Sequence, residues 1–142
     1  MNKFAHVYPA MVTPFNEDGS FNFETAKKHA DWMISQGIDG VGVLMAAGEY
    51  QSVTLEEHKT YVREMVPYVK GKGASVIVGA SRERVEDVVE LMENAREAGA
   101  DAAMVLPSFY YRMDQKEIYK HYEYINDHSG LDIMVYNNPH CS

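Results

Sequence analysis

Residues 40–57, Gly40-Val-Gly-Val-Leu-Met-Ala-Ala-Gly-Glu-Tyr-Gln-Ser-Val-Thr-Leu-Glu-Glu57, hold an apolar run, a glycine-containing loop and a helix start in direct succession. The run from Gly40 to Met45 has the length of a buried strand. Thr54 and Glu57 have the spacing of a capping box, in which each side chain bonds the backbone amide of the other residue. This stretch therefore predicts a strand, a loop and a helix.

The same order recurs along the chain. Apolar runs follow one another at a spacing of about 30 residues, which is the size of one βαβ unit. The five runs are His6–Val12, Gly40–Met45, Ser75–Gly79, Ala102–Leu106 and Asp132–Tyr136. Because they are continuously apolar rather than alternating, they indicate parallel strands covered by helices on at least one face.

Four amphipathic helical patterns separate the runs. The expected helix starts are Asn22 or Phe23, Thr54, Ser81 as an N-cap, and Asp114 in a second capping box with Glu117. Glycines stand where helix ends are expected, at positions 37, 99 and 130. The sequence thus predicts β-α-β-α-β-α-β-α-β in one unit, with no linker dividing it.

Composition excludes several classes of protein. The 142 residues include 46% hydrophobic residues, enough for one domain with a real core, and the net charge is −8. The basic residues form no stripe, so neither nucleic acid nor an anionic membrane is an expected partner. No apolar stretch approaches the roughly 20 residues of a membrane span. The single cysteine, Cys141, forms no internal disulfide, and we expect a cytoplasmic protein.

Two architectures fit this order of elements: an open doubly wound sheet of five strands, or the first part of an eight-stranded barrel of about 250 residues. A doubly wound nucleotide binder usually has a glycine-rich turn after its first strand. Here Thr13-Pro14-Phe15 occupies that place, and Gly40-Val-Gly42 lies inside a strand without a third glycine. The dinucleotide-binding motif is therefore rejected.

The loops that follow the expected strands carry a distinctive set of residues. They include Val12-Thr-Pro-Phe15, Ala47-Gly-Glu49 followed by Leu55-Glu-Glu57, Tyr110 with Tyr119 and His121, and Val135-Tyr-Asn-Asn-Pro139. In this order and spacing, over essentially the whole chain, they resemble the dihydrodipicolinate synthase and N-acetylneuraminate lyase family of pyruvate-handling aldolases. The resemblance implies an α/β fold of the TIM (β/α)8 barrel family. Residues 1–142 would cover about the first five strands and four helices as a single domain.

The resemblance also implies a lysine on strand six that forms a Schiff base with pyruvate or another 2-oxo acid. Such a lysine must be deprotonated, which requires burial or a neighbouring cation. The lysines of this chain all fall on expected helices, in loops or at the terminus: Lys3, Lys27, Lys28, Lys59, Lys70, Lys72, Lys116 and Lys120. We therefore expect residues 1–142 to lack the Schiff-base lysine and to be inactive alone.

Two tyrosines match the catalytic tyrosines of the family. Tyr136 matches the strand-five tyrosine, which implies a general acid and base beside the imine. Tyr110 matches the second tyrosine of the proton relay by ungapped alignment from Tyr119 and His121, and Tyr111 is the alternative. The competing interpretation is that both tyrosines only pack.

The turn after the second run departs from the family pattern. Ala46 and Ala47 stand where the family commonly has two hydroxyl residues, and alanine neither relays a proton nor donates to a carboxylate. Backbone amides around Ala46, Ala47 and Gly48 remain candidates for binding the substrate. Cys141 stands where dihydrodipicolinate synthases carry an arginine. These departures favour a divergent aldolase or dehydratase, or a member that no longer catalyses.

The remaining expectations concern ligands and partners. The histidines lack metal-ligand spacing, so neither a metal nor a cofactor is predicted. The expected partners are a small 2-oxo acid and further copies of the same chain in a homo-oligomer. Two alternatives stay open: a non-catalytic half-barrel that self-associates through its edge strands, and a flavodoxin-like binding module with strand order 2-1-3-4-5.

Overall fold

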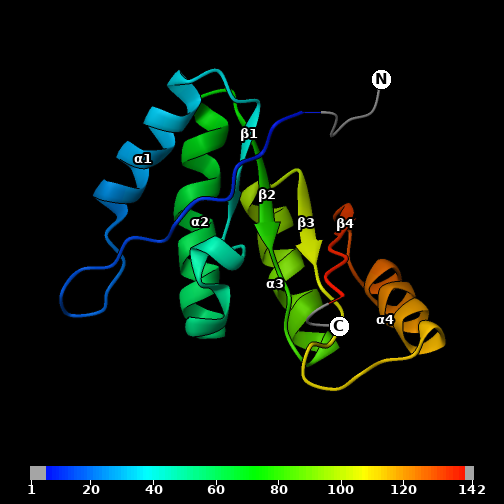
Figure 1. Ribbon diagram of the computed structural model, residues 1–142. Helices are drawn as coiled ribbons and strands as arrows, with labels where there is room; N and C mark the ends of the chain where they lie inside the picture. The colour runs from blue at the N-terminus through cyan, green and yellow to red at the C-terminus, as the bar shows by residue number, and fades with distance from the viewer. Residues whose placement is uncertain (1–5, 140–142) are drawn as a thin grey trace.

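The computed structural model describes residues 6–139, so Lys3 and Cys141 lie outside the described residues. Strands and helices alternate through this part of the chain (Figure 1). The elements are α1 (Phe23–Ser35), β1 (Gly40–Val43), η1 (Ala46–Gly48), η2 (Tyr50–Ser52), α2 (Leu55–Gly71), β2 (Ser75–Gly79), α3 (Val85–Ala98), β3 (Ala102–Val105), α4 (Gln115–His128) and β4 (Ile133–Val135).

The four strands form one parallel sheet in the order β1-β2-β3-β4, so each strand pairs with the next one along the chain. The segment before α1 joins the sheet beside β1, because the Met11 N–H donates to the Gly42 carbonyl at 2.7 Å and the Gly42 N–H donates to the Pro9 carbonyl at 2.9 Å. This sequential order confirms the barrel-type arrangement. It rules out the flavodoxin-like order, in which the first and third runs would pair.

The first expected strand, His6–Val12, is wrong in extent. It is reduced to a single parallel bridge between Ala10 and Gly42. Pro9 has no N–H to donate, and β1 is only four residues long, so no second bridge extends the ladder. The other four expected strands are present.

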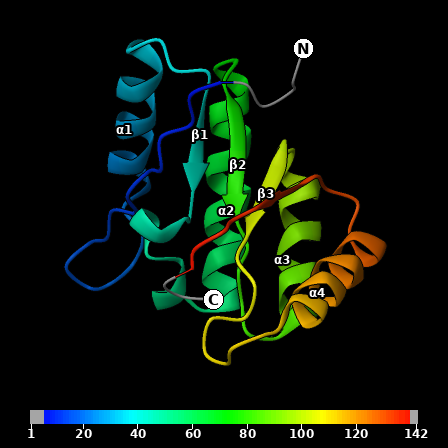
Figure 2. The same cartoon turned by 45° about the vertical axis from the view of Figure 1, so that its right-hand side comes forward.

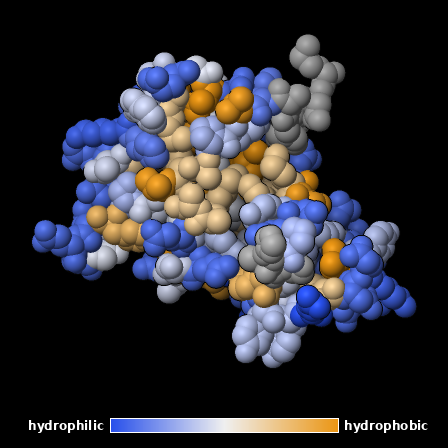
Figure 3. Space-filling model, viewed as in Figure 1, coloured by the Kyte–Doolittle hydropathy of each residue, from blue (hydrophilic) through white to orange (hydrophobic). Residues whose placement is uncertain are grey.

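The helices lie side by side in one layer behind the sheet, and the N-terminal segment runs along its β1 edge (Figures 1 and 2). Alternate strand residues point to opposite faces. Val41, Val43, Val76 and Val78 are fully buried in the core between the sheet and the helices. The other face carries a small apolar cluster around Ile77, and in Figure 3 an apolar area occupies the middle of this side of the molecule.

The expected helix boundaries are largely confirmed. Both capping boxes form: the Thr54 hydroxyl accepts from the Glu57 N–H at 3.2 Å, the Glu57 carboxylate accepts from the Thr54 N–H at 2.8 Å, and Asp114 and Glu117 repeat the pattern at the start of α4. Gly99 ends α3 with φ of 93°, in the left-handed region that glycine enters without a steric penalty.

Ser81 is not the N-cap of the third helix, contrary to expectation. Helix α3 begins at Val85 with Arg84 in the cap position and no capping side chain. The Ser81 hydroxyl instead accepts from the Leu106 N–H at 2.8 Å. Ser81 comes three residues before the cap position of α3, and it satisfies an amide that β3 leaves unpaired at its carboxyl end.

Candidate active site

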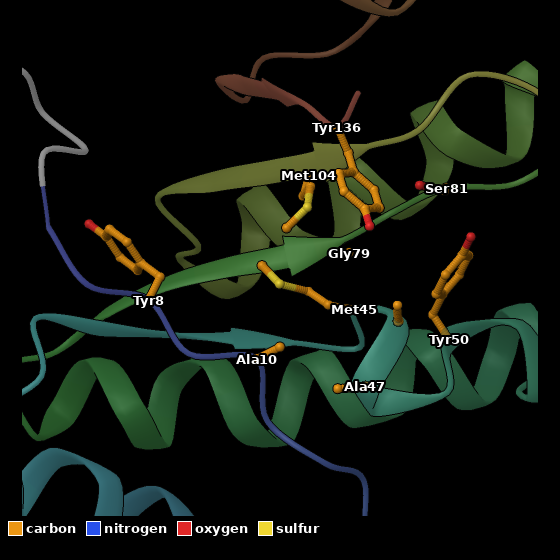
Figure 4. Close-up of a pocket in the computed structure, with 10 residues that line it drawn as sticks. Tyr8, Ala10, Met45, Ala47, Tyr50, Gly79, Ser81, Met104 and Tyr136 are labelled. Carbon is orange, nitrogen blue, oxygen red and sulfur yellow. The ribbon is translucent and has the colours of Figure 1, made fainter. Parts of the chain in front are cut away.

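A cavity of about 380 Å³ lies at the carboxyl ends of the strands (Figure 4). This is the end of a parallel α/β sheet where loops from several strands converge on one point. The lining is apolar except for four side chains: the phenols of Tyr8, Tyr50 and Tyr136, and the hydroxyl of Ser81. The lining residues are Tyr8, Ala10, Met45, Ala46, Ala47, Tyr50, Gly79, Ser81, Met104 and Tyr136.

Tyr136 enters the cavity from the residue that follows β4. Its N–H donates to the Val105 carbonyl at 2.8 Å, which holds its backbone against β3. Its phenol oxygen accepts a long hydrogen bond, 3.4 Å, from the Asn138 side-chain amide. In Figure 4 the ring points inward and the phenol oxygen lies toward Gly79. Tyr136 is therefore a proton-bearing group at the mouth of the cavity.

Tyr110 and Tyr111 are not brought to this cavity. They are 77% and 72% exposed, and their rings meet edge to face with centroids 4.9 Å apart. Their loop is tied to Glu83, whose carboxylate accepts from the N–H groups of Phe109 at 3.1 Å and Tyr110 at 3.0 Å. Within one copy of residues 6–139, Tyr110 therefore does not reach the cavity that Tyr136 lines, and the two expected catalytic tyrosines are separated.

The turn after β1 forms one wall. Ala46 and Ala47 line the cavity, whereas Gly48 lies just behind them. The Gly48 N–H donates to the Met45 carbonyl at 2.9 Å, and its carbonyl accepts from the Thr13 hydroxyl at 2.7 Å. A Cβ at Gly48 would lie 3.0 Å from the Met11 carbonyl oxygen, which is tighter than most side-chain contacts. Glycine therefore lets the turn pack closely against the segment before α1.

Two residues on either side of this turn have left-handed backbones. Leu44 has φ of 49° and Glu49 has φ of 57°, although neither is glycine. Such conformations cost energy and persist where the surrounding structure enforces them, which is common at functional sites. The Leu44 carbonyl also approaches Gly79 so closely that any side chain at that position would clash with it.

Arg82 links two of the loops around the cavity, and it was not predicted from the sequence. Its guanidinium donates to the carbonyls of Tyr50 at 2.9 Å, Ser81 at 3.1 Å and Val53 at 3.2 Å. It also lies over the Tyr50 ring, 5.8 Å from the centroid. Burial lowers the pKa of Arg82, but an arginine remains charged at neutral pH. Arg82 thus connects the loops that follow β1 and β2.

His58 packs behind the cavity and makes no contact with its interior. It is fully buried, and its Nε2 lies 2.7 Å from the Gly79 carbonyl. Burial lowers the pKa of His58 to about 4, so the ring is neutral at pH 7 and donates from Nε2. Residues 6–139 contain no group of three side chains arranged to hold a metal ion, and no helix in that range is long and apolar enough to cross a membrane.

None of the lysines between residues 6 and 139 lines the cavity. Lys59 is the most buried of those that form ion pairs, and it pairs with Glu56 and with Glu90 on α3. These carboxylates raise the pKa of Lys59, which keeps the amine protonated and not nucleophilic. The other ion-paired lysines likewise lie on the helical side, for example Lys70 with Asp101 at 2.8 Å.

Known proteins are similar to this chain in sequence and in fold. The model of the dihydrodipicolinate synthetase family matches residues 3–142. A 4-hydroxy-tetrahydrodipicolinate synthase from Bartonella bacilliformis is 38% identical over 130 residues, which are 92% of this chain and 44% of the relative. The corresponding enzyme from Methanosphaera stadtmanae is 34% identical over 92% of this chain and 43% of its own length.

Solved structures give the same result. Dihydrodipicolinate synthase DapA-2 from Bacillus anthracis matches with a TM-score of 0.91 and 31% identity, over 100% of this chain and 48% of that one. YagE, a family member from E. coli K12 solved in complex with pyruvate, matches with a TM-score of 0.92 and 27% identity, over 98% and 46%.

The described α/β unit therefore has the fold of part of a TIM barrel, and the chain spans somewhat less than half the length of these relatives. The matched segments include the turn at Gly48 and the strand that leads into Tyr136. The chain belongs to the dihydrodipicolinate synthetase family.

Proposed function

We propose that the cavity is the 2-oxo acid site of a Schiff-base lyase, an aldolase or dehydratase, to which this chain contributes the Tyr136 phenol and the turn at Ala46 and Ala47. The observation that carries the proposal is the convergence of these residues on one cavity at the carboxyl ends of the strands. YagE was solved with pyruvate bound, which supports a small 2-oxo acid as the ligand.

The chemistry assigned to Tyr136 is proton transfer. When an amine attacks the ketone carbon, the carbonyl oxygen must gain protons and leave as water before the imine forms. A phenol positioned beside that oxygen donates one proton and takes it back in the reverse direction. Tyr136 has this freedom because its phenol oxygen only accepts one long hydrogen bond within the described residues.

The amine itself is proposed to come from outside residues 6–139. The lysines of this range that form ion pairs are held by carboxylates away from the cavity, and none of its lysines reaches the lining. The relatives extend beyond the matched part, and the family resemblance assigns the Schiff-base lysine to a sixth strand. Residues 1–142 alone are therefore proposed to form no imine.

A fusion of residues 1–139 to the remaining part of the Bacillus anthracis relative tests this function. The fusion should form an imine with pyruvate that borohydride traps as a covalent adduct, detected by intact mass. Residues 1–142 should give no adduct. In the fusion, Tyr136→Phe should slow trapping, whereas Tyr124→Phe, on the outer helix α4, should not. A fusion with native-like circular dichroism that gives no adduct would contradict the proposed function.

A second candidate is a non-catalytic half-barrel that self-associates, which would also make the protein a homo-oligomer. The open edge at β4 favours it: Val135 is 58% exposed, and β4 pairs only on its β3 side within the described residues. Light scattering tests it. Concentration-dependent dimers that Val135→Lys dissociates would support association through this edge, and a monodisperse monomer would contradict it.

A further inference from the structure

Ser81 is the most deeply buried polar side chain that lines the cavity. It is 6% exposed, and it follows β2 by two residues. Figure 4 shows Ser81 on the segment that leaves Gly79, on the side of the cavity where the phenol oxygen of Tyr136 lies. Both residues line the same cavity, so a ligand small enough to occupy it lies within reach of both.

The Ser81 hydroxyl has an unused donor. A serine hydroxyl has one hydrogen to donate and two lone pairs that accept. One lone pair accepts from the Leu106 N–H at 2.8 Å, which fixes the position of the oxygen. Among residues 6–139, no acceptor takes the hydroxyl hydrogen, so it remains available to a molecule in the cavity.

The charge around the cavity favours an anionic partner for this hydrogen. No lysine, arginine or carboxylate is among the lining residues, so the side-chain donors there are hydroxyl groups. The Arg82 guanidinium belongs to the next residue and donates to the Ser81 carbonyl at 3.1 Å. A fixed hydroxyl close to a partly buried cation is a favourable place for a carboxylate.

We infer that Ser81 is a substrate-binding residue that donates its hydroxyl hydrogen to the carboxylate of the bound 2-oxo acid. This inference rests on the proposed function and adds a residue to it. Ala46 and Ala47 line the opposite wall without a hydroxyl, so Ser81 supplies from the loop after β2 a donor that the turn after β1 lacks. Arg82 acts as a positioning residue through its bond to the Ser81 carbonyl.

The experiment compares an anionic ligand with a neutral one of nearly the same size, with the chain of residues 1–142 uniformly labelled with ¹⁵N. Pyruvate and its neutral amide, pyruvamide, are titrated separately, and dissociation constants are read from amide shifts of cavity residues. Ser81→Ala should weaken pyruvate binding by about tenfold, the effect of losing one hydrogen bond to a charged group. Pyruvamide binding should weaken by less than about threefold, because a bond between neutral groups contributes less.

Two variants complete the design. Ser81→Thr keeps the hydroxyl and should retain most of the preference for pyruvate. Ser35→Ala removes an exposed hydroxyl that bonds the Trp32 carbonyl at the end of α1, and it should change neither affinity. Hydrogen exchange of the Leu106 amide reports separately on the structural bond that Ser81→Ala also removes.

The outcomes separate the inference from the function on which it rests. A loss in Ser81→Ala that is equal for both ligands, or no loss, would show that Ser81 only satisfies the Leu106 amide, and the inference would be overturned while the proposed function stands. If pyruvate shifts no cavity residue in the unmodified chain, the proposed function itself fails.

Discussion

The Thr13 hydroxyl donates a 2.7 Å hydrogen bond to the Gly48 carbonyl across 35 residues of sequence. Thr13 is 5% exposed, and Gly48 is buried. The bond fastens the loop before α1 to the turn η1, whose Ala46 and Ala47 form one wall of the cavity. Two motifs that are far apart in the sequence thus form one structural unit.

Thr13→Val should therefore destabilise the chain. It keeps the shape of the side chain but leaves the buried Gly48 carbonyl without its partner, which costs about 1–3 kcal/mol in the free energy of unfolding. Thr13→Ser keeps the hydroxyl and should lose less. Urea denaturation of the three proteins measures the difference. Equal urea midpoints for wild type and Thr13→Val would show that the bond between Thr13 and Gly48 contributes nothing to stability.

The stability of the chain should depend on the protonation of His58. Its pKa is about 4 in the folded protein, chiefly because burial disfavours the imidazolium, against 6.5 when unfolded. Between these values the unfolded state binds more protons, so stability is retained above pH 6.5 and falls as the pH decreases toward 4. The loss over this window is about 3 kcal/mol, at 1.36 kcal/mol per pKa unit.

His58→Gln provides the matched control for this effect. A glutamine amide can still donate to the Gly79 carbonyl, but it does not titrate. Other groups titrate in both proteins, so the quantity to compare is the difference in unfolding free energy between wild type and variant from pH 7 to pH 4. That difference should shrink as the pH falls. A constant difference would mean that His58 is not buried in neutral form.

Glu49→Gly should make the chain more stable. Glu49 has φ of 57°, and an L residue pays a steric penalty in this left-handed region that glycine avoids. The gain should be up to about 1 kcal/mol, partly offset by the greater freedom of glycine in the unfolded chain. Glu49→Ala removes the carboxylate but keeps the Cβ, and it should show no such gain. Thermal unfolding distinguishes the two variants.

Glu83 should control the order of the loop that carries Tyr110. Its carboxylate accepts from the N–H groups of Phe109 and Tyr110, and from the Ser108 hydroxyl at 2.5 Å. In Glu83→Ala the two amides should exchange with deuterium about tenfold faster or more, since bonds to a charged acceptor contribute about 1.5–3 kcal/mol. Glu86→Ala, on the solvent side of α3, is the control. Unchanged exchange rates of the Phe109 and Tyr110 amides in Glu83→Ala would show that Glu83 does not hold this loop in place.

Local sequence signals predicted the helices well because their causes are local. The capping boxes at Thr54 and Asp114 and the glycine at 99 act within a few residues, so the pattern determines the boundary. The strand order also followed from the sequence, once the strand-end residues favoured a barrel over an open sheet.

Features that depend on contacts between distant segments were missed or misread. Ser81 was expected to cap a helix because serine commonly does so, but its partner is an amide 25 residues away. Arg82 gave no signal, because two of its three carbonyl acceptors, Tyr50 and Val53, belong to a loop that only the fold brings close to it. Tyr50 directly follows Glu49, so its place beside the turn at Ala47-Gly-Glu49 is the sequence signal for it.

The central claim is that the cavity around Tyr136 binds a 2-oxo acid. A titration of ¹⁵N-labelled residues 1–142 with pyruvate measures this most directly. A second groove of about 410 Å³ between α4 and β4, lined in part by Tyr119 and Asn126, serves as the internal comparison. We predict saturable shifts of the Ala47, Ser81 and Tyr136 amides and none of the Tyr119 and Asn126 amides. Shifts confined to the second groove, or no saturable shift at any residue, would contradict the claim.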